Sequence, residues 1–182
     1  MIRIYLVRHG KAAAGFGTHV DPGLDETGIE QARRVADQLT SLDPMPIYSS
    51  PLARAQETAA PLASRWQTDV VLEPRVAEVP SPTSDLEARA AWLAQAMQGT
   101  WQDLGQRWID WRDTLAACLA EQTRDCVMFS HYVAINAAVG AATGDDRMRI
   151  FSPDNCSVTI LTSDAGTLGV AELGASAITR VN

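Results

Sequence analysis

The tripeptide Arg8-His9-Gly10 places an imidazole that can attack phosphorus beside a guanidinium that can bind phosphoryl oxygens. It directly follows the run Ile2 to Val7, which is nearly continuous in hydrophobicity and rich in β-branched and aromatic residues. Such a run is typical of a strand buried on both faces of a mainly parallel sheet. The histidine therefore falls where a strand ends. Alone, the tripeptide is a weak signal, because a surface turn can carry the same residues.

Two further polar groups also follow predicted strands. Pro46 to Ser49 predicts a short strand, and Ser50-Pro51 predicts an N-cap followed by a proline at the first helical position, so that Arg54 lies in a first helical turn. Cys126 to Phe129 predicts another buried strand, and Ser130-His131 the turn after it. In open α/β sheets, ligands bind beyond the carboxyl ends of the strands. We therefore expect the side chains of these turns to converge.

The rest of the chain alternates helical and strand patterns. Further helices are predicted from Asp25 or Thr27 to before Pro44, and over Asp85 to Met97, Trp101 to Ala120 and Tyr132 to Ala142. Further strands are predicted over Val70 to Leu72, Ser157 to Leu161 and Leu168 to Leu173. The first helix has two candidate caps, Asp25 itself or a capping box Thr27-x-x-Glu30. Asp164-Ala165-Gly166 predicts a hairpin turn between the last two strands. This alternation predicts an α/β fold of three layers, α/β/α, around a mostly parallel sheet.

Length and charge limit the possible partners. A chain of 182 residues is long enough for one domain with a core and too short for two of ordinary size, so a single domain over 1–182 is expected. The net charge of -7 disfavours nucleic acid and anionic membranes as partners. The sequence has no signal-peptide pattern and no run of about 18 apolar residues, which favours a cytoplasmic location.

The cysteines favour a structural role. Cys118, Cys126 and Cys156 are odd in number, widely spaced and set in apolar surroundings, which argues against a disulfide framework or a zinc site. None lies in a C-x5-R phosphate loop, so a cysteine nucleophile is not favoured. Buried reduced thiols are expected.

Four segments, in this order, resemble the signatures of the histidine phosphatase superfamily, the phosphoglycerate mutase-like proteins. They are Arg8-His9-Gly10, Asp21-Pro22-Gly23-Leu24-Asp25-Glu26-Thr27-Gly28-Ile29-Glu30-Gln31-Ala32, Tyr48-Ser49-Ser50-Pro51-Leu52-Ala53-Arg54-Ala55-Gln56-Glu57-Thr58-Ala59 and Phe129-Ser130-His131. The resemblance extends to Asn155-Cys156-Ser157-Val158, so it covers most of the chain. It implies a phosphoglycerate mutase-like fold with a helical insert at about 79–122.

The resemblance implies a role for each motif residue. His9 would be the nucleophile that becomes phosphorylated, and it must be unprotonated to attack. Arg8 and Arg54 would bind the phosphoryl oxygens. His131 would donate a hydrogen bond to the same group, aided by backbone N–H groups near Tyr132 at the start of the following helix.

The leaving alkoxide needs a proton, which requires a carboxylic acid within reach. Glu78 is the first candidate, since it follows the third predicted strand, where family members carry their acid. The alternative roles for Glu78 are a solvated loop acid or a salt-bridge partner of Arg75, and Glu73 is the fallback acid. Many relatives continue with a Trp-Glu-Gly stretch after the acid, whereas this chain has the proline-rich segment Val79 to Pro82.

The expected function is a phosphomonoester hydrolase of the histidine acid phosphatase type, acting through a phosphohistidine on a small-molecule substrate without metal or cofactor. The alternatives are a phosphomutase, a protein-phosphohistidine phosphatase and a catalytically silent phosphate- or partner-binding module. The natural substrate is not readable from the sequence.

Two regions around the expected site carry no familiar motif. The loop after Gly10 lacks the asparagine that many relatives use to contact phosphate, and Thr18 or backbone amides are the substitutes; His19 is expected at the pocket rim or in solvent. In the insert, Trp101, Leu104, Trp108, Trp111 and Leu115 have helical spacing. We interpret this stripe as core or a subunit contact, which permits a homodimer, with Trp92 or Trp101 lining a substrate pocket as the alternative.

Overall fold

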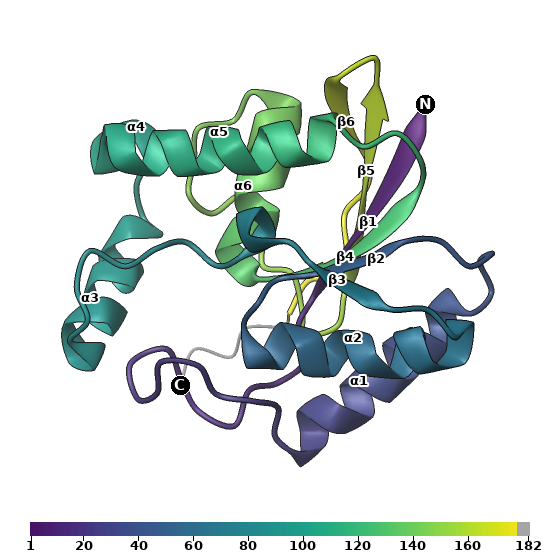
Figure 1. The fold of residues 1–182 in the computed structure, drawn as a ribbon. Coiled ribbons are helices and arrows are strands. Elements are labelled where there is room, and N and C mark those ends of the chain that lie inside the picture. Colours follow the sequence, from purple (N-terminus) through teal and green to yellow (C-terminus); the bar gives the residue numbers. More distant parts are fainter. Residues whose placement is uncertain (178–182) are drawn as a thin grey trace.

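One central sheet organises the computed structural model, which describes residues 1–177, with strands in the order β3-β2-β4-β1-β5-β6 (Figure 1). Four strands are parallel and two form an antiparallel hairpin at one edge. The parallel strands are β1 (Ile2–Arg8), β2 (Ile47–Ser49), β3 (Val70–Leu72) and β4 (Cys126–Ser130); the hairpin is β5 (Val158–Asp164) and β6 (Thr167–Glu172). This arrangement confirms the predicted mostly parallel sheet.

Helices cover both faces of the sheet (Figure 1). One layer holds α1 (Glu26–Leu39) and α2 (Ala53–Trp66); the other holds α5 (Gln106–Ala120) and α6 (Tyr132–Thr143), preceded by α3 (Leu86–Ala96) and α4 (Trp101–Leu104). Because side chains alternate along a strand, Tyr5 and Val7 pack in the cluster under α1 and α2, whereas Ile4 and Leu6 pack in the cluster under α5 and α6. The continuous apolar run of β1 therefore serves both layers.

The starts of α1 and α2 decide how the site loops are held. Asp25 caps α1, because its carboxylate accepts a hydrogen bond from the Gly28 amide at 2.7 Å. The predicted start of α2 was wrong by two residues: the helix begins at Ala53, and Leu52 occupies the cap position without a side-chain bond. Asp21, from the loop after Gly10, accepts from the Ala53 amide at 2.9 Å and supplies the missing acceptor. Arg54 still lies in the first turn.

The prediction of one helix from Trp101 to Ala120 was also wrong. Gly105, with φ of 94°, separates the short helix α4 from α5. The break lets the ring of Trp101, which is fully buried, lie 5.7 Å from that of Trp111. Trp108 instead lies 5.8 Å from Trp92 and donates its indole N–H to the Pro80 carbonyl at 3.0 Å. The tryptophans therefore contribute to the core and tie α5 to the segment after Glu78.

The cysteines are free thiols, and Cys118 and Cys126 are buried as expected, whereas Cys156 is half-buried. Burial raises the pKa of each thiol to about 12. Within residues 1–177, no helix combines the length and apolar character that a membrane span requires.

Candidate active site

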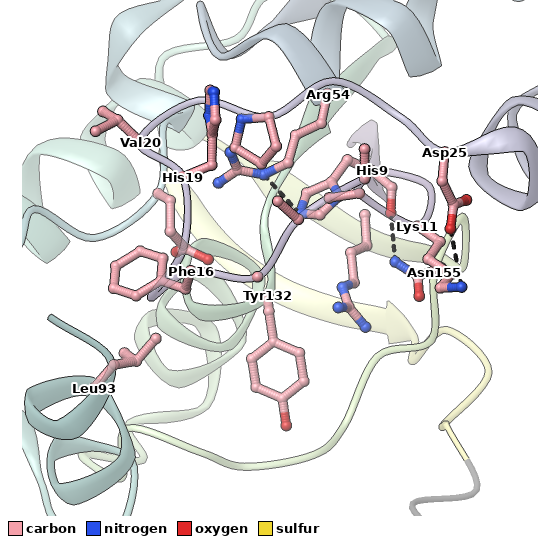
Figure 2. A pocket seen from close by; sticks show the side chains of 17 residues that line it. His9, Lys11, Phe16, His19, Val20, Asp25, Arg54, Leu93, Tyr132 and Asn155 are labelled. Carbon is pink, nitrogen blue, oxygen red and sulfur yellow. Dashed lines mark hydrogen bonds and ion pairs between the residues drawn. The ribbon is translucent and has the colours of Figure 1, made fainter. Parts of the chain in front are cut away.

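A pocket of about 490 Å³ opens beyond the carboxyl ends of the parallel strands (Figure 2). Its walls include Arg8, His9, Arg54, Glu78, Tyr132 and Asn155, together with residues of the loop between Lys11 and Pro22. Four of the five residues predicted to be catalytic thus line one cavity, although they come from three different segments of the chain. The fifth, His131, is absent from the described lining, and its ring lies 5.1 Å from that of His9.

His9 is held as a neutral imidazole with a defined tautomer. Its side chain is buried, and Nδ1 lies 2.7 Å from the carbonyl oxygen of Gly10. Since a carbonyl only accepts, Nδ1 carries the proton and Nε2 carries the lone pair. Burial, followed by the positive charge of Arg54, lowers the pKa of His9 to about 3. The lone pair on Nε2 is therefore free of a proton at neutral pH, as nucleophilic attack requires.

The backbone around His9 is fixed by three separate segments. The His9 amide donates to Ser130 at 3.0 Å, and Asn155 Nδ2 donates to the His9 carbonyl at 3.0 Å. The Gly10 amide donates to Thr58 Oγ1, which in turn donates to the Arg54 carbonyl at 2.6 Å. The sequence interpretation gave Asn155 and Thr58 no role, although both lie within segments that carry the family resemblance.

Two guanidiniums flank His9. Arg54 Nε donates to His9 Nε2 at 3.2 Å, and Arg54 Nη1 lies 3.8 Å from an Asp21 carboxylate oxygen. Arg8 donates to the Pro153 carbonyl at 2.8 Å and lies over the Tyr132 ring at 5.2 Å, while its Nε is buried without a partner among the described residues. Arg54 has one long ion pair, with Asp21, and Arg8 has none among the described residues, so both keep donors for an anion.

Glu78 is half-buried and directed at the start of α6. Its carboxylate accepts hydrogen bonds from the amides of Val79 at 2.9 Å, Ala134 at 3.2 Å and Val133 at 3.3 Å. Burial raises the pKa of Glu78, while these amides and the charge of Arg54 act in the opposite direction. The net rise favours the protonated acid relative to an exposed carboxyl group.

The fallback acid Glu73 takes a different position. It forms an ion pair with Arg75 at 2.7 Å, and that guanidinium holds the pKa of Glu73 below its usual range. Glu73 is absent from the described lining of the pocket. Arg75 therefore pairs with Glu73 and with Glu121, and Glu78 is the carboxyl group that faces the pocket.

His131 is fully buried, with its ring 5.1 Å from that of His9. Burial, followed by the neighbouring His9 and the guanidiniums of Arg54 and Arg8, moves the pKa of His131 well below its ordinary value. Its Nε2 lies 2.7 Å from Ser50 Oγ, which also accepts from the Leu52 amide, and its Nδ1 is buried without a partner in residues 1–177. If the Ser50 hydroxyl donates to Nε2, the ring proton lies on Nδ1, where it is a free donor.

Some predicted contacts at the pocket require correction. The amides of Val133 and Ala134 donate to Glu78 and are therefore not free to bind phosphate. Among the helix amides predicted to bind phosphate, that of Tyr132 has no hydrogen-bond acceptor within the described residues. Thr18 donates to the Gly15 carbonyl at 3.1 Å and is absent from the described pocket lining. Lys11 is the cation that this loop contributes, paired with Asp25 at 2.9 Å (Figure 2).

The alternative prediction that Trp92 or Trp101 lines the substrate pocket does not hold for this pocket. Neither Trp92 nor Trp101 is among the described lining residues; Leu93 is the residue that α3 contributes. His19 is exposed and lines the pocket, as expected. Residues 1–177 contain no group of three or more His, Cys, Asp or Glu side chains arranged to hold a metal ion.

The sequence matches the profile of the histidine phosphatase superfamily (branch 1) over residues 4–175. Among curated proteins, it is 29% identical to "Probable phosphoglycerate mutase GpmB" of Photorhabdus laumondii over 187 aligned residues, which cover 87% of this chain and 84% of that protein. A shorter similarity, 41% over 80 residues, links it to an uncharacterized protein of Mycobacterium tuberculosis and covers 42% of this chain and 40% of that one.

Two solved structures align with nearly the whole chain. A mycobacterial glucosyl-3-phosphoglycerate phosphatase aligns with a TM-score of 0.73 and 25% identity, covering 97% of this chain and 100% of that one. Bacillus stearothermophilus YhfR aligns with a TM-score of 0.78 and 22% identity, over 97% of this chain and 98% of that one, which shows the shared fold. The fold, the four motif segments and the profile agree, and the chain belongs to the histidine phosphatase superfamily.

Proposed function

We propose that this protein hydrolyses phosphomonoesters through a phosphohistidine on His9. The observation that carries the proposal is the state of His9: its Nδ1 is fixed by the Gly10 carbonyl, and its Nε2 lies beside Arg54 in a pocket that also holds Arg8 and Glu78. A neutral nucleophile between two guanidiniums suits attack on a dianionic phosphoryl group, because the cations offset the charge of the substrate.

In the first step, His9 Nε2 attacks phosphorus in line with the ester bond. A P–N bond forms, and the P–O bond to the alcohol breaks. Arg8 and Arg54 bind the phosphoryl oxygens, and the free Nδ1–H of His131 donates to one of them. Protonated Glu78 gives its proton to the leaving oxygen, so that a neutral alcohol departs.

In the second step, water attacks the phosphohistidine. Glu78, now ionised, takes a proton from the water as the P–O bond forms, and the electron pair of the breaking P–N bond returns to Nε2. The products are the alcohol and inorganic phosphate, and both His9 and Glu78 return to their starting states. The residues supply the positive charge themselves, so the proposed reaction uses neither a metal ion nor a cofactor.

A phosphomutase is the second candidate, and the similarity to a probable phosphoglycerate mutase supports it. A mutase must protect its phosphohistidine from water until the second substrate arrives, whereas a phosphatase hydrolyses it. The glucosyl-3-phosphoglycerate phosphatase alignment favours hydrolysis. A protein-phosphohistidine phosphatase and a binding module without turnover remain further alternatives.

The test is phosphate release from phenyl phosphate by the wild type and by His9→Ala, with Arg124→Ala, an exposed position outside the described pocket lining, as the control. We expect His9→Ala to lose turnover and Arg124→Ala to retain it. Rapid acid quench of the wild type should trap an acid-labile phosphoenzyme that His9→Ala lacks. Unchanged turnover in His9→Ala would contradict the proposal, and transfer to added 2-phosphoglycerate faster than to water would favour the mutase.

The proposal includes four further expectations. The substrate is a small molecule, and neither nucleic acid nor a membrane is a partner. Treatment with EDTA should leave turnover unchanged, and the protein should act in the cytoplasm, where fractionation would locate it. A homodimer is the fourth expectation, and light scattering is its test.

A further inference from the structure

A second cavity of about 720 Å³ adjoins the active-site pocket. The two cavities share Phe16, Glu78, Leu93 and Tyr132 in their walls, so they meet at the carboxyl group proposed to protonate the leaving oxygen. Figure 2 shows Phe16 and Leu93 on the side of the active-site pocket away from Lys11 and Asp25. An alcohol that receives its proton from Glu78 therefore has this space beside it.

The wall of the second cavity is mainly apolar. Apart from the four shared residues, its described lining is Gly17, Ala90, Ala94, Met97, Gln98, Val133 and Arg149. The charged side chains in that described lining are Glu78, which the proposed reaction uses, and Arg149, which is exposed and solvated. Apolar groups buried against such a wall lose water contacts without leaving polar wall atoms unpaired.

Phe16 is fixed in place at the junction. The Arg89 guanidinium lies 4.1 Å from the centroid of its ring, and Gly17 lies against Ala90 of α3 so closely that an added Cβ would fall 2.8 Å from the Ala90 methyl. The loop after Gly10 is thus packed against α3. The aromatic wall is preorganised, which lowers the entropic cost of binding a group against it.

A third cavity, of about 350 Å³, also reaches Glu78 and offers a different environment. Its lining includes Arg54 and Arg89 with Ser81, Thr83 and Ser84, so it would suit a polar or anionic alcohol. The apolar cavity is twice as large, and each of the two cavities shares four lining residues with the active-site pocket. The two cavities predict opposite substrate preferences.

We infer that the second cavity is the leaving-group site and that the substrates are monoesters of apolar alcohols. This inference rests on the proposed function, since Glu78 marks the leaving oxygen only if the protein is a phosphatase. An alkyl chain that leaves water on binding gains up to about 0.8 kcal/mol per methylene. Rates should therefore depend on the size of the alcohol, even though the alcohol is remote from the phosphoryl group.

The test compares n-alkyl phosphates from ethyl to hexyl, whose leaving alcohols have nearly the same pKa. For the wild type, kcat/KM should rise about threefold per methylene. Ala94→Phe fills the cavity from an exposed position on α3 and should reduce the hexyl-to-ethyl ratio about tenfold, with little effect on ethyl phosphate. Ala91→Phe is the matched control, since Ala91 is exposed on the same helix outside the described cavity wall.

The outcomes separate the inference from the proposed function. A wild type that hydrolyses ethyl and hexyl phosphate equally well, or that prefers 3-phosphoglycerate to both, overturns the inference and leaves the proposed function standing. An equal fall in the ratio for Ala94→Phe and Ala91→Phe also overturns it. A wild type that releases no phosphate from any ester overturns the proposed function itself.

Discussion

The neutrality of His9 should make the protein less stable in acid. In the folded state its pKa is lowered from 6.5 to about 3, so the unfolded chain binds a proton at His9 before the folded protein does. The stability contribution is complete above about pH 6.5 and is lost as the pH falls toward 3, below which both states are protonated. Between about pH 8 and pH 5, these values correspond to a loss of about 2 kcal/mol.

The measurement is the free energy of unfolding in urea as a function of pH for the wild type and His9→Asn. The difference between the two proteins should change by about 2 kcal/mol from about pH 8 to pH 5, in the direction that makes the wild type relatively less stable in acid. His19→Asn, which removes an exposed histidine, is the control and should follow the wild type. Because Arg54 contributes to the lowered pKa, Arg54→Gln should reduce the slope.

Parallel stability curves for the wild type and His9→Asn would refute this reasoning. They would mean that His9 takes up its proton at the same pH in both states, so the fold would not keep it neutral. The nucleophilic role would then lose its electrostatic support. The experiment therefore tests the chemistry of the site without requiring knowledge of the substrate.

Three other substitutions test separate parts of the site. Glu78→Gln should lower kcat by about a hundredfold or more for alkyl phosphates and far less for p-nitrophenyl phosphate, whose leaving group needs no proton; equal losses would contradict the acid role. Asn155→Ala removes the bond to the His9 carbonyl and should cost about 1 kcal/mol in urea unfolding, so unchanged stability would contradict that contact's importance. Gly28→Ala forces a methyl group against the Lys11 backbone and should cost about 2 kcal/mol or more, whereas Gly99→Ala, whose methyl group would lie 3.0 Å from a side-chain oxygen of Asp103, should cost less; equal losses would count against the clash.

Local signals predicted much of the fold. The apolar run of β1, the cap at Asp25 and the hairpin turn each depend on residues adjacent in the sequence, and all three occur in the structure. At the hairpin, Ala165 and Gly166 have φ values of 49° and 83°, as a tight two-residue turn requires. These features follow from backbone sterics and hydrogen bonding within a few residues.

Features that depend on distant contacts were less predictable. The regular spacing of the tryptophans favoured a continuous helix, but burial of Trp101 against Trp111 is achieved with a break at Gly105. The start of α2 was misassigned because its amide acceptor is Asp21, more than thirty residues earlier in the chain. The sequence did indicate where α4 starts, since Thr100 and Asp103 form a capping box at its first turn, just before the break.

The site residues also divide into those that local motifs predicted and those that depend on distant contacts. Motifs located Arg8, His9 and Arg54, whose roles depend on residue type at the ends of strands. They did not show that Ser50, outside the described pocket lining, contacts Nε2 of His131. That contact joins residues 81 positions apart and exists only after the sheet has formed.

Substrate binding should raise the proton affinity of the titratable groups around the pocket. Two guanidiniums and His9 line the pocket, with His131 beside His9, and burial together with the arginine charges opposes protonation of both imidazoles. A phosphoryl dianion brings about two negative charges to the same space, which offsets the guanidiniums and raises the proton affinity of nearby groups. In the proposed reaction, this favours the acid form of Glu78, which protonates the leaving oxygen. His9 would have to attack phosphorus before it takes up a proton, and Arg54, which donates to Nε2, would have to turn to the phosphoryl oxygens.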